Sequence, residues 1–189
     1  MMMMTRSIRP NDERSALTTD DIATCLANGL AHETRCLGVF PSDYPLSLDL
    51  AASSASPKRA VAWVMNTAPS EHPGLHWVAY YRAGNGTPEF FDSVGMTPAD
   101  YALPNGDAVA RTSLQSLNSH VCGQYCVFYL CQRSRGLSPN QVLSLLKSMP
   151  VNKRERLLID FCASLMRPMK GSGTAGCQCC TSPECFCAH

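Results

Sequence analysis

Cys122 is the residue of this chain best placed to act as a nucleophile. It lies in the stretch 114–131, LQSLNSHVCGQYCVFYLC, where Asn118 and Ser119 are favourable N-cap residues and an apolar run follows. We therefore expect Cys122 in the first turn of a helix, where unpaired backbone N–H groups and the helix dipole stabilise a thiolate. Gly123 is expected to leave the approach to the sulfur open. A lone cysteine on an apolar helix is more often an inert core residue, so the assignment depends on partners.

Three further side chains complete the set that thiol catalysis requires, because a thiolate needs a base and the base needs an orienting group. His76 precedes one apolar, aromatic stretch and Asp92 ends a second. The segment between these two strands contains Asn-Gly, which is typical of a hairpin, so both residues are expected at the same end of the ladder. Gln115, seven positions before Cys122, is expected at the end of a strand with its amide directed at an oxyanion. Taken singly, the histidine reads as structural and the aspartate as a solvated turn residue.

The pattern HW…FFDSVG…Q-x6-CGQYC resembles the adenain family, the cysteine proteases of adenoviruses and related virus-like mobile elements. The resemblance covers roughly residues 19–166 and implies a papain-like site with its parts in a different order. It implies that His76 is the base, Asp92 the orienting group, Gln115 the oxyanion donor and Cys122 the nucleophile. Trp77, directly after the histidine, also fits. Adenovirus enzymes usually have Glu where this chain has Asp92, although virus-like relatives with Asp exist.

The resemblance implies a cysteine endopeptidase that cleaves viral or virus-like capsid or core precursors next to small residues, glycine especially. It implies a monomer in the host nucleus or the virion, and otherwise an intracellular protein that is not secreted. SUMO-deconjugating proteases share the His, Asp, Gln, Cys order, but their Gln-to-Cys spacing is typically one residue shorter. An isopeptidase for SUMO or ubiquitin-like proteins therefore stays an alternative. A non-catalytic, protease-like protein that binds nucleic acid or metal is the alternative of another class.

The composition is that of an ordinary globular domain, with 45% hydrophobic and 16% charged residues in a chain of 189. No stretch approaches the ~20 apolar residues that span a bilayer, so no membrane partner is expected. The initial methionines lack the apolar region of a signal peptide. We therefore expect a reducing compartment and do not interpret the 11 cysteines as a disulfide framework.

The order of elements predicts an α+β fold, in which a small mixed sheet carries the nucleophile helix and further helices surround it. We expect a disordered N-terminus over 1–17, a protease domain over 18–168 and a Gly-rich linker with a Cys-rich tail over 169–189. The remaining expected elements are a helix opened by Thr18-Thr19-Asp20-Asp21, a loop over 38–45, a linker over 51–58, a buried central strand over 60–66, the hairpin over 76–92, a strand over 109–114, and helices over 138–149 and 152–165.

The tail carries its own set of expectations. Six soft ligands lie close together in the tail, and they could form a site for Zn²⁺ or Cu(I): Cys177, Cys179, Cys180, Cys185, Cys187 and His189. The alternatives are a disordered, thiol-rich tail and a redox-linked peptide. The stretch 169–173 also fits the cleavage pattern of adenain-type enzymes, with the cut between Ser172 and Gly173. By resemblance, the released Cys-containing peptide is an activator.

Residues 133–170 are rich in basic side chains, with Glu155 and Asp160 as the acidic ones. Such a segment is either a solvated helix face or a contact for nucleic acid or an acidic partner. Adenovirus proteases bind DNA as a cofactor, so the resemblance implies DNA as an activator and partner. The basic residues are Arg133, Arg135, Lys147, Lys153, Arg154, Arg156, Arg167 and Lys170.

Overall fold

A five-stranded mixed sheet forms the centre of the computed structural model, which describes residue 12 and residues 15–46 and 59–167. The strand order follows the chain, β1-β2-β3-β4-β5. β1 pairs parallel with β2, the pairs β2–β3 and β3–β4 are antiparallel, and β5 pairs parallel with β4. The strands are β1 (Thr34–Phe40), β2 (Ala60–Asn66), β3 (Trp77–Arg82), β4 (Glu89–Phe91) and β5 (Asp107–Ala108).

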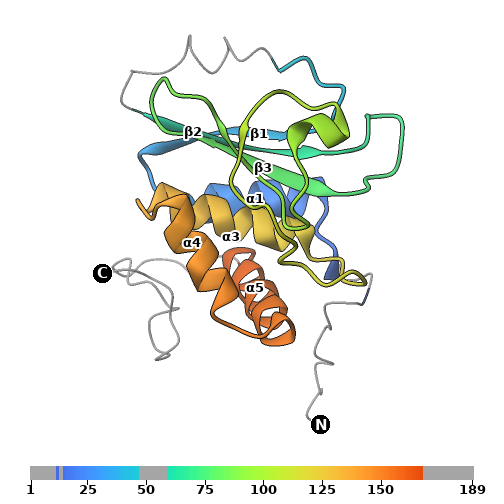
Figure 1. Ribbon diagram of the computed structural model, residues 1–189, viewed down its shortest axis with the longest axis vertical. Helices are drawn as coiled ribbons and strands as arrows, with labels where there is room; N and C mark the ends of the chain where they lie inside the picture. The colour runs from blue at the N-terminus through green and yellow to red at the C-terminus, as the bar shows by residue number, and fades with distance from the viewer. Residues whose placement is uncertain (1–11, 13–14, 47–58, 168–189) are drawn as a thin grey trace.

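Helices cover one face of this sheet, with α3 lying directly against it and α4 and α5 beyond (Figure 1). They are α1 (Thr19–Gly29), α3 (Cys122–Ser134), α4 (Pro139–Lys147) and α5 (Val151–Leu165), and a short 3₁₀ helix, η2 (Pro98–Tyr101), lies among the loops. The expected α+β architecture, with the nucleophile helix packed on a small mixed sheet, is confirmed. Among the described residues, no helix combines the length and the apolar character needed to cross a bilayer.

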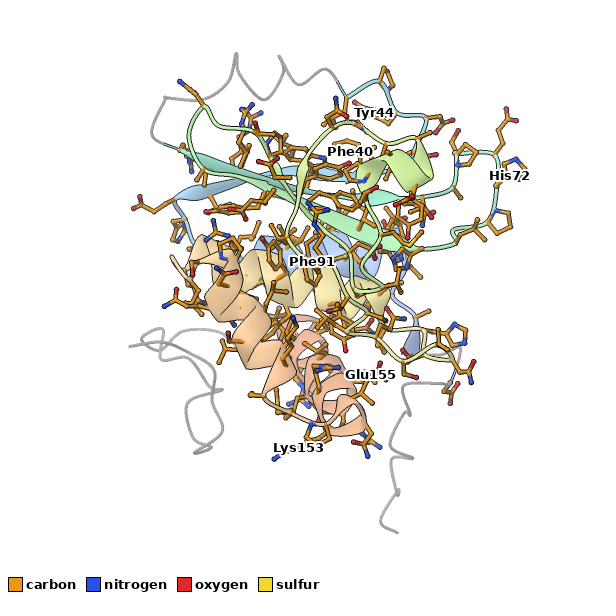
Figure 2. All side chains as sticks on the ribbon, in the orientation of Figure 1. Phe40, Tyr44, His72, Phe91, Lys153 and Glu155 are labelled. Carbon is orange, nitrogen blue, oxygen red and sulfur yellow. The ribbon has the colours of Figure 1, made fainter. Side chains whose placement is uncertain are left out.

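Two apolar cores bury the sheet from both sides. On the helical side, Phe91 stacks on Tyr129 of α3 with ring centroids 4.3 Å apart, and Figure 2 labels Phe91 between sheet and helix. On the other side, Trp63 stacks on Tyr80 at 4.9 Å, within a smaller cluster that includes Leu103. β2 is buried along almost its whole length, so the expected central strand is confirmed.

Capping boxes begin two of the expected helices. The Thr18 hydroxyl accepts from the Asp21 N–H and the Asp21 carboxylate accepts from the Thr18 N–H, which begins α1. Ser138 and Gln141 do the same for α4, with Pro139 as its first residue. Each box satisfies N–H groups that would otherwise lack partners at a helix start.

Three expected element boundaries are wrong. Residues 38–45 are not all loop, because β1 extends to Phe40 and pairs with β2 through a bulge between Cys36 and Gly38. Residues 109–114 do not form the expected strand; β5 covers only Asp107–Ala108, where the pairing with β4 ends. The nucleophile helix begins at Cys122 after Val121, which makes no side-chain cap, so Asn118 and Ser119 are not its caps.

Residues 15–17, which the sequence assigns to a polar N-terminal segment, are packed in the structure. Leu17 is 9% exposed and belongs to the main core, and its carbonyl accepts a hydrogen bond from the Trp77 indole at 3.1 Å. The Ser15 carbonyl accepts from the amide of buried Gln124. The expected linker over 51–58 lies outside the described residues.

Candidate active site

His76 and Asp92 form a close pair at one end of the β3–β4 ladder. His76 directly precedes β3, and its carbonyl accepts from the Thr67 N–H at 2.9 Å. Asp92 directly follows β4. The His76 Nε2 lies 2.6 Å from the Asp92 Oδ1, and the aspartate side chain is fully buried while the imidazole is 16% exposed. The antiparallel hairpin thus brings together the two residues that the sequence places at its ends.

Four donors surround the Asp92 carboxylate. Oδ1 contacts the His76 imidazole and accepts from the Val94 N–H at 3.0 Å. Oδ2 accepts from the Met96 N–H at 2.9 Å and from the Tyr101 hydroxyl at 3.1 Å. Because both oxygens are held, the carboxylate has one orientation in which to receive the imidazole.

Gly95 closes the turn that carries these donors. Its N–H bonds to the Asp92 carbonyl at 3.2 Å, and its φ is +86°, in the region where glycine has no steric penalty. A Cβ at this position would lie 2.8 Å from the carbonyl carbon of Thr112. The turn therefore needs glycine for both its conformation and its close approach to the neighbouring backbone.

The surroundings of His76 favour its charged form. Burial lowers the pKa of the imidazole, but hydrogen bonds to Asp92 and Cys122, and the charges of both, outweigh it and raise the pKa to about 9. Since Nε2 faces Asp92, Nδ1 is the nitrogen left for Cys122. The imidazole is thus paired with a fixed carboxylate and shares one groove with the Cys122 thiol, as a general acid–base requires.

Cys122 is the first residue of α3 and is half-buried, as expected for a thiol at a helix start. Gly123 has a packing role that was not anticipated from the sequence. A Cβ on this buried glycine would lie 3.2 Å from the Cβ of Leu17 and from the Cδ1 of Ile22, and 3.4 Å from the Trp77 ring. Gly123 therefore makes room for the N-terminal segment and the indole, and its role in the approach to the sulfur stays a prediction.

Gln115 lies in a bend and not at a strand end, but its amide is held from two sides. Its Oε1 accepts from the Ser93 hydroxyl at 2.7 Å, and its Nε2 donates to the Ser119 carbonyl at 2.7 Å. Within the part of the chain that the structure describes, the second N–H of this amide has no acceptor. That N–H is available to a developing oxyanion.

His76, Gln115 and Cys122 line one groove of about 760 Å³. No Asp, Glu, Lys or Arg of the described residues lines it. Two exposed leucines stand on its walls, Leu75 with 78% and Leu117 with 97% of its surface accessible. The groove also runs past Phe40 and the loop that carries His72, which Figure 2 labels. Its described lining is therefore a mixture of apolar and polar side chains, with His72 and His120 in addition to His76.

Several side chains that support the site were not anticipated from the sequence. Ser93 holds Gln115, Tyr101 holds Asp92, and Glu155 binds the loop after Gln115. Asn66, buried at the end of β2, accepts from the N–H groups of Ala68 and Leu75 in the loop before His76. A polar residue ending an otherwise apolar strand was a usable signal for Asn66. The position of Ser93 beside Asp92 was a weaker one.

Two residues of the basic segment 133–170 are structural. Arg133 pairs with Glu89 at 2.6 Å and lies over the Tyr81 ring. Arg154 is 7% exposed, and its guanidinium donates to the Tyr125 hydroxyl at 2.9 Å and to the carbonyl of Leu114. Neither guanidinium is presented to a partner, so the segment is less basic at its surface than its sequence indicates.

The tail residues predicted as metal ligands, Cys177, Cys179, Cys180, Cys185, Cys187 and His189, lie outside the described residues, as does the predicted cut between Ser172 and Gly173. Among the residues that are described, no group of three or more His, Cys, Asp or Glu is arranged to hold a metal ion.

Comparisons with known proteins give structural likeness only. No family model and no curated protein matches the chain. The central domain of an uncharacterised Legionella pneumophila protein is similar with a TM-score of 0.51 and 13% identity, over 79% of this chain and 97% of that domain. A protease of African swine fever virus (ASFV) is similar with a TM-score of 0.43 and 23% identity, over 58% of this chain. This chain spans 44% of the length of the viral protease. Both likenesses concern the fold alone.

Proposed function

We propose that this chain is a cysteine endopeptidase of the adenain type. One observation carries the proposal: the imidazole of His76 is paired with the buried carboxylate of Asp92 and lines one groove together with Cys122 and Gln115. A nucleophile, a base, an orienting group and an oxyanion donor are the four parts that acyl transfer requires.

The first half of the reaction forms an acyl-enzyme. The Cys122 thiolate attacks the scissile carbonyl carbon while His76 holds the proton as imidazolium, which Asp92 stabilises. The carbonyl oxygen becomes an oxyanion that accepts from the free N–H of Gln115 and from the Cys122 backbone N–H. Collapse breaks the C–N bond, and the imidazolium gives its proton to the departing amine.

The second half regenerates the thiolate. Neutral His76 takes a proton from water, whose oxygen attacks the thioester carbonyl, and the second tetrahedral intermediate expels Cys122. Removal of one oxyanion donor typically lowers kcat by ~10²–10³. We therefore expect losses of this order when Gln115 is replaced by Ala.

The groove limits the substrates that fit this mechanism. No Asp, Glu, Lys or Arg is present among its described lining residues, so charged substrate side chains buried there would lose hydration without gaining an ionic partner from them. Leu75 and Leu117 offer apolar contact on its walls. These features support the proposal of extended precursor segments with aliphatic and glycine residues, such as those of capsid or core proteins.

Thiol labelling and peptide hydrolysis test the function together. Iodoacetamide should alkylate Cys122 faster than the buried Cys126 or Cys131, as mapped by mass spectrometry of the digested protein. The wild type should also hydrolyse a fluorogenic Leu-Ala-Gly-Gly amide, and Cys122→Ala should not, while its melting temperature stays close to that of the wild type. Retained hydrolysis in Cys122→Ala would refute the proposal.

The same assay separates the protease from an isopeptidase. SUMO and ubiquitin conjugates should be left intact under conditions in which glycine-containing precursor peptides are cut. Preferential cleavage of the conjugates would assign the same four residues to deconjugation. If neither assay shows cleavage that depends on Cys122, the result would favour a protein whose role is binding.

A further inference from the structure

Glu155 is a buried carboxylate directed at the loop that carries the oxyanion donor. It lies in the first half of α5, where Figure 2 labels it, and is 2% exposed. Its Oε1 accepts from the Ser116 N–H at 2.8 Å and from the Ser119 hydroxyl at 2.9 Å. A buried carboxylate is retained only with such donors, since burial without them is costly.

The preceding residue of α5 holds the start of the same loop. The Arg154 guanidinium donates to the carbonyls of Leu114 and Leu146 and to the hydroxyl of Tyr125. The Tyr125 hydroxyl in turn donates to the Leu114 carbonyl at 2.9 Å. Two consecutive residues of α5 thus fix the loop on both sides of Gln115.

The loop passes this constraint to the Gln115 amide. The Ser119 carbonyl accepts from the Gln115 Nε2–H, and the single Ser119 hydroxyl proton is directed at Glu155 at 2.9 Å, with the Ser116 carbonyl at 3.2 Å. Any shift of Ser119 therefore turns this amide, which belongs to the groove lining and whose second N–H has no acceptor among the described residues. Such a rotation matters because an oxyanion donor acts only from the correct place.

We propose that Glu155 is a positioning residue for the oxyanion hole, acting on Gln115 through Ser119 and Ser116. The inference rests on the proposed function. Because Glu155 does not line the groove, it would act on amide hydrolysis without touching the substrate.

A matched pair of substitutions tests this link. Both bonds of Glu155 go to one oxygen, so Glu155→Gln can keep them, whereas Glu155→Leu removes the acceptor at similar size. For the fluorogenic Leu-Ala-Gly-Gly amide, Glu155→Leu should lower kcat about 10- to 100-fold with KM changed less than about threefold. Glu155→Gln should stay within about threefold of the wild type. Asp160→Asn, exposed on the same helix, is the control.

A second readout distinguishes positioning from general damage. Alkylation of Cys122 by iodoacetamide forms no oxyanion, so its rate should be equal in the wild type and in Glu155→Leu. In a Gln115→Ala background, Glu155→Leu should lower kcat no further, because the two changes remove the same interaction. If Glu155→Leu does not fold, Ser119→Ala removes only the hydroxyl link and should lower kcat in the same way.

Each result has a defined meaning. Additive losses in the double variant, or alkylation that falls with hydrolysis, would assign Glu155 a purely structural role and overturn the inference. An active wild type whose kcat is unchanged by Glu155→Leu and Ser119→Ala would overturn it while leaving the proposed function intact. A wild type without Cys122-dependent hydrolysis would overturn the proposed function, and the inference with it.

Discussion

Replacing Asp92 by Asn should move the alkaline limb of the activity to lower pH. Burial by itself would lower the pKa of His76. Hydrogen bonds to Asp92 and Cys122, together with the charges of both residues, outweigh burial and raise the pKa from 6.5 to about 9. Each pKa unit corresponds to about 1.4 kcal/mol, so the raised value represents about 3 kcal/mol in favour of imidazolium. The imidazolium is present below this pKa and lost above it, so wild-type kcat/KM should fall as the pH rises through about 9.

The hydrogen bonds of Asp92 explain why an amide cannot replace it. Oδ1 serves His76 and the Val94 N–H, and Oδ2 serves the Met96 N–H and Tyr101. An Asn side chain has only one acceptor oxygen. If this oxygen faces His76, the NH₂ group is placed against the Met96 N–H, which is also a donor. If the amide is turned round, the NH₂ group donates to the His76 Nε2. The second arrangement stabilises neutral imidazole with its proton on Nδ1, the nitrogen that must accept from Cys122.

The measurement is kcat/KM for the fluorogenic peptide amide from about pH 5 to about pH 11, with Asp107→Asn as an exposed control. In Asp92→Asn the alkaline limb should fall by about 1–3 pH units, with kcat lowered about 10²–10⁴-fold. An alkaline limb that stays at the wild-type pH in this variant would show that Asp92 does not support the charge of His76. The reasoning about the site would then fail.

Four further predictions concern the turn, the groove wall and the partners. Gly95→Ala should cost about 1–3 kcal/mol in urea unfolding, because φ is +86° and the new Cβ meets the neighbouring backbone; an unchanged midpoint would contradict this. Gly123→Ala should displace residues 15–18 from the groove wall and raise KM, measured with the peptide amide; unchanged KM would separate this wall from substrate binding. Duplex DNA should raise turnover at low salt, with an effect that falls steeply as salt increases, and equal turnover with and without DNA would remove it as a partner. Intact-mass measurement should show a cut between Ser172 and Gly173 in the wild type but not in Cys122→Ala, and full-length masses for both would exclude self-processing.

Interactions within a few residues could be predicted from the sequence because both partners are visible in one short window. The capping boxes at Thr18 and Ser138 close within three residues, and they begin α1 and α4 as expected. The continuous apolar stretch 60–66 is also visible in one short window, and it indicated a strand buried on both faces. The hairpin also brought His76 and Asp92 together, since its turn signals fixed which strand ends meet.

The start of the nucleophile helix shows where such local reasoning fails. Ser119 has the residue type of a cap, but its hydroxyl bonds to Glu155, 36 positions away, and the helix begins only at Cys122. The sequence suggested only access to the sulfur for the glycine after the cysteine, and the structure adds that it accommodates Leu17 and Trp77. In both cases the decisive contact is with a residue far away in the sequence, which a short window does not show.

The tertiary structure also decides which charged side chains are exposed at the surface. The sequence shows Arg133 and Arg154 as part of a basic segment, but they are buried against Glu89 and backbone carbonyls from other elements. The sequence determined which chemical groups are present and, through short-range bonds, most helix starts and the central strand. Contacts between distant segments decide which groups meet in the groove and which residues support it. They also decide which charges reach the surface. Those contacts form only when the helices pack on the sheet, because their energy comes from burial that no single segment can achieve alone.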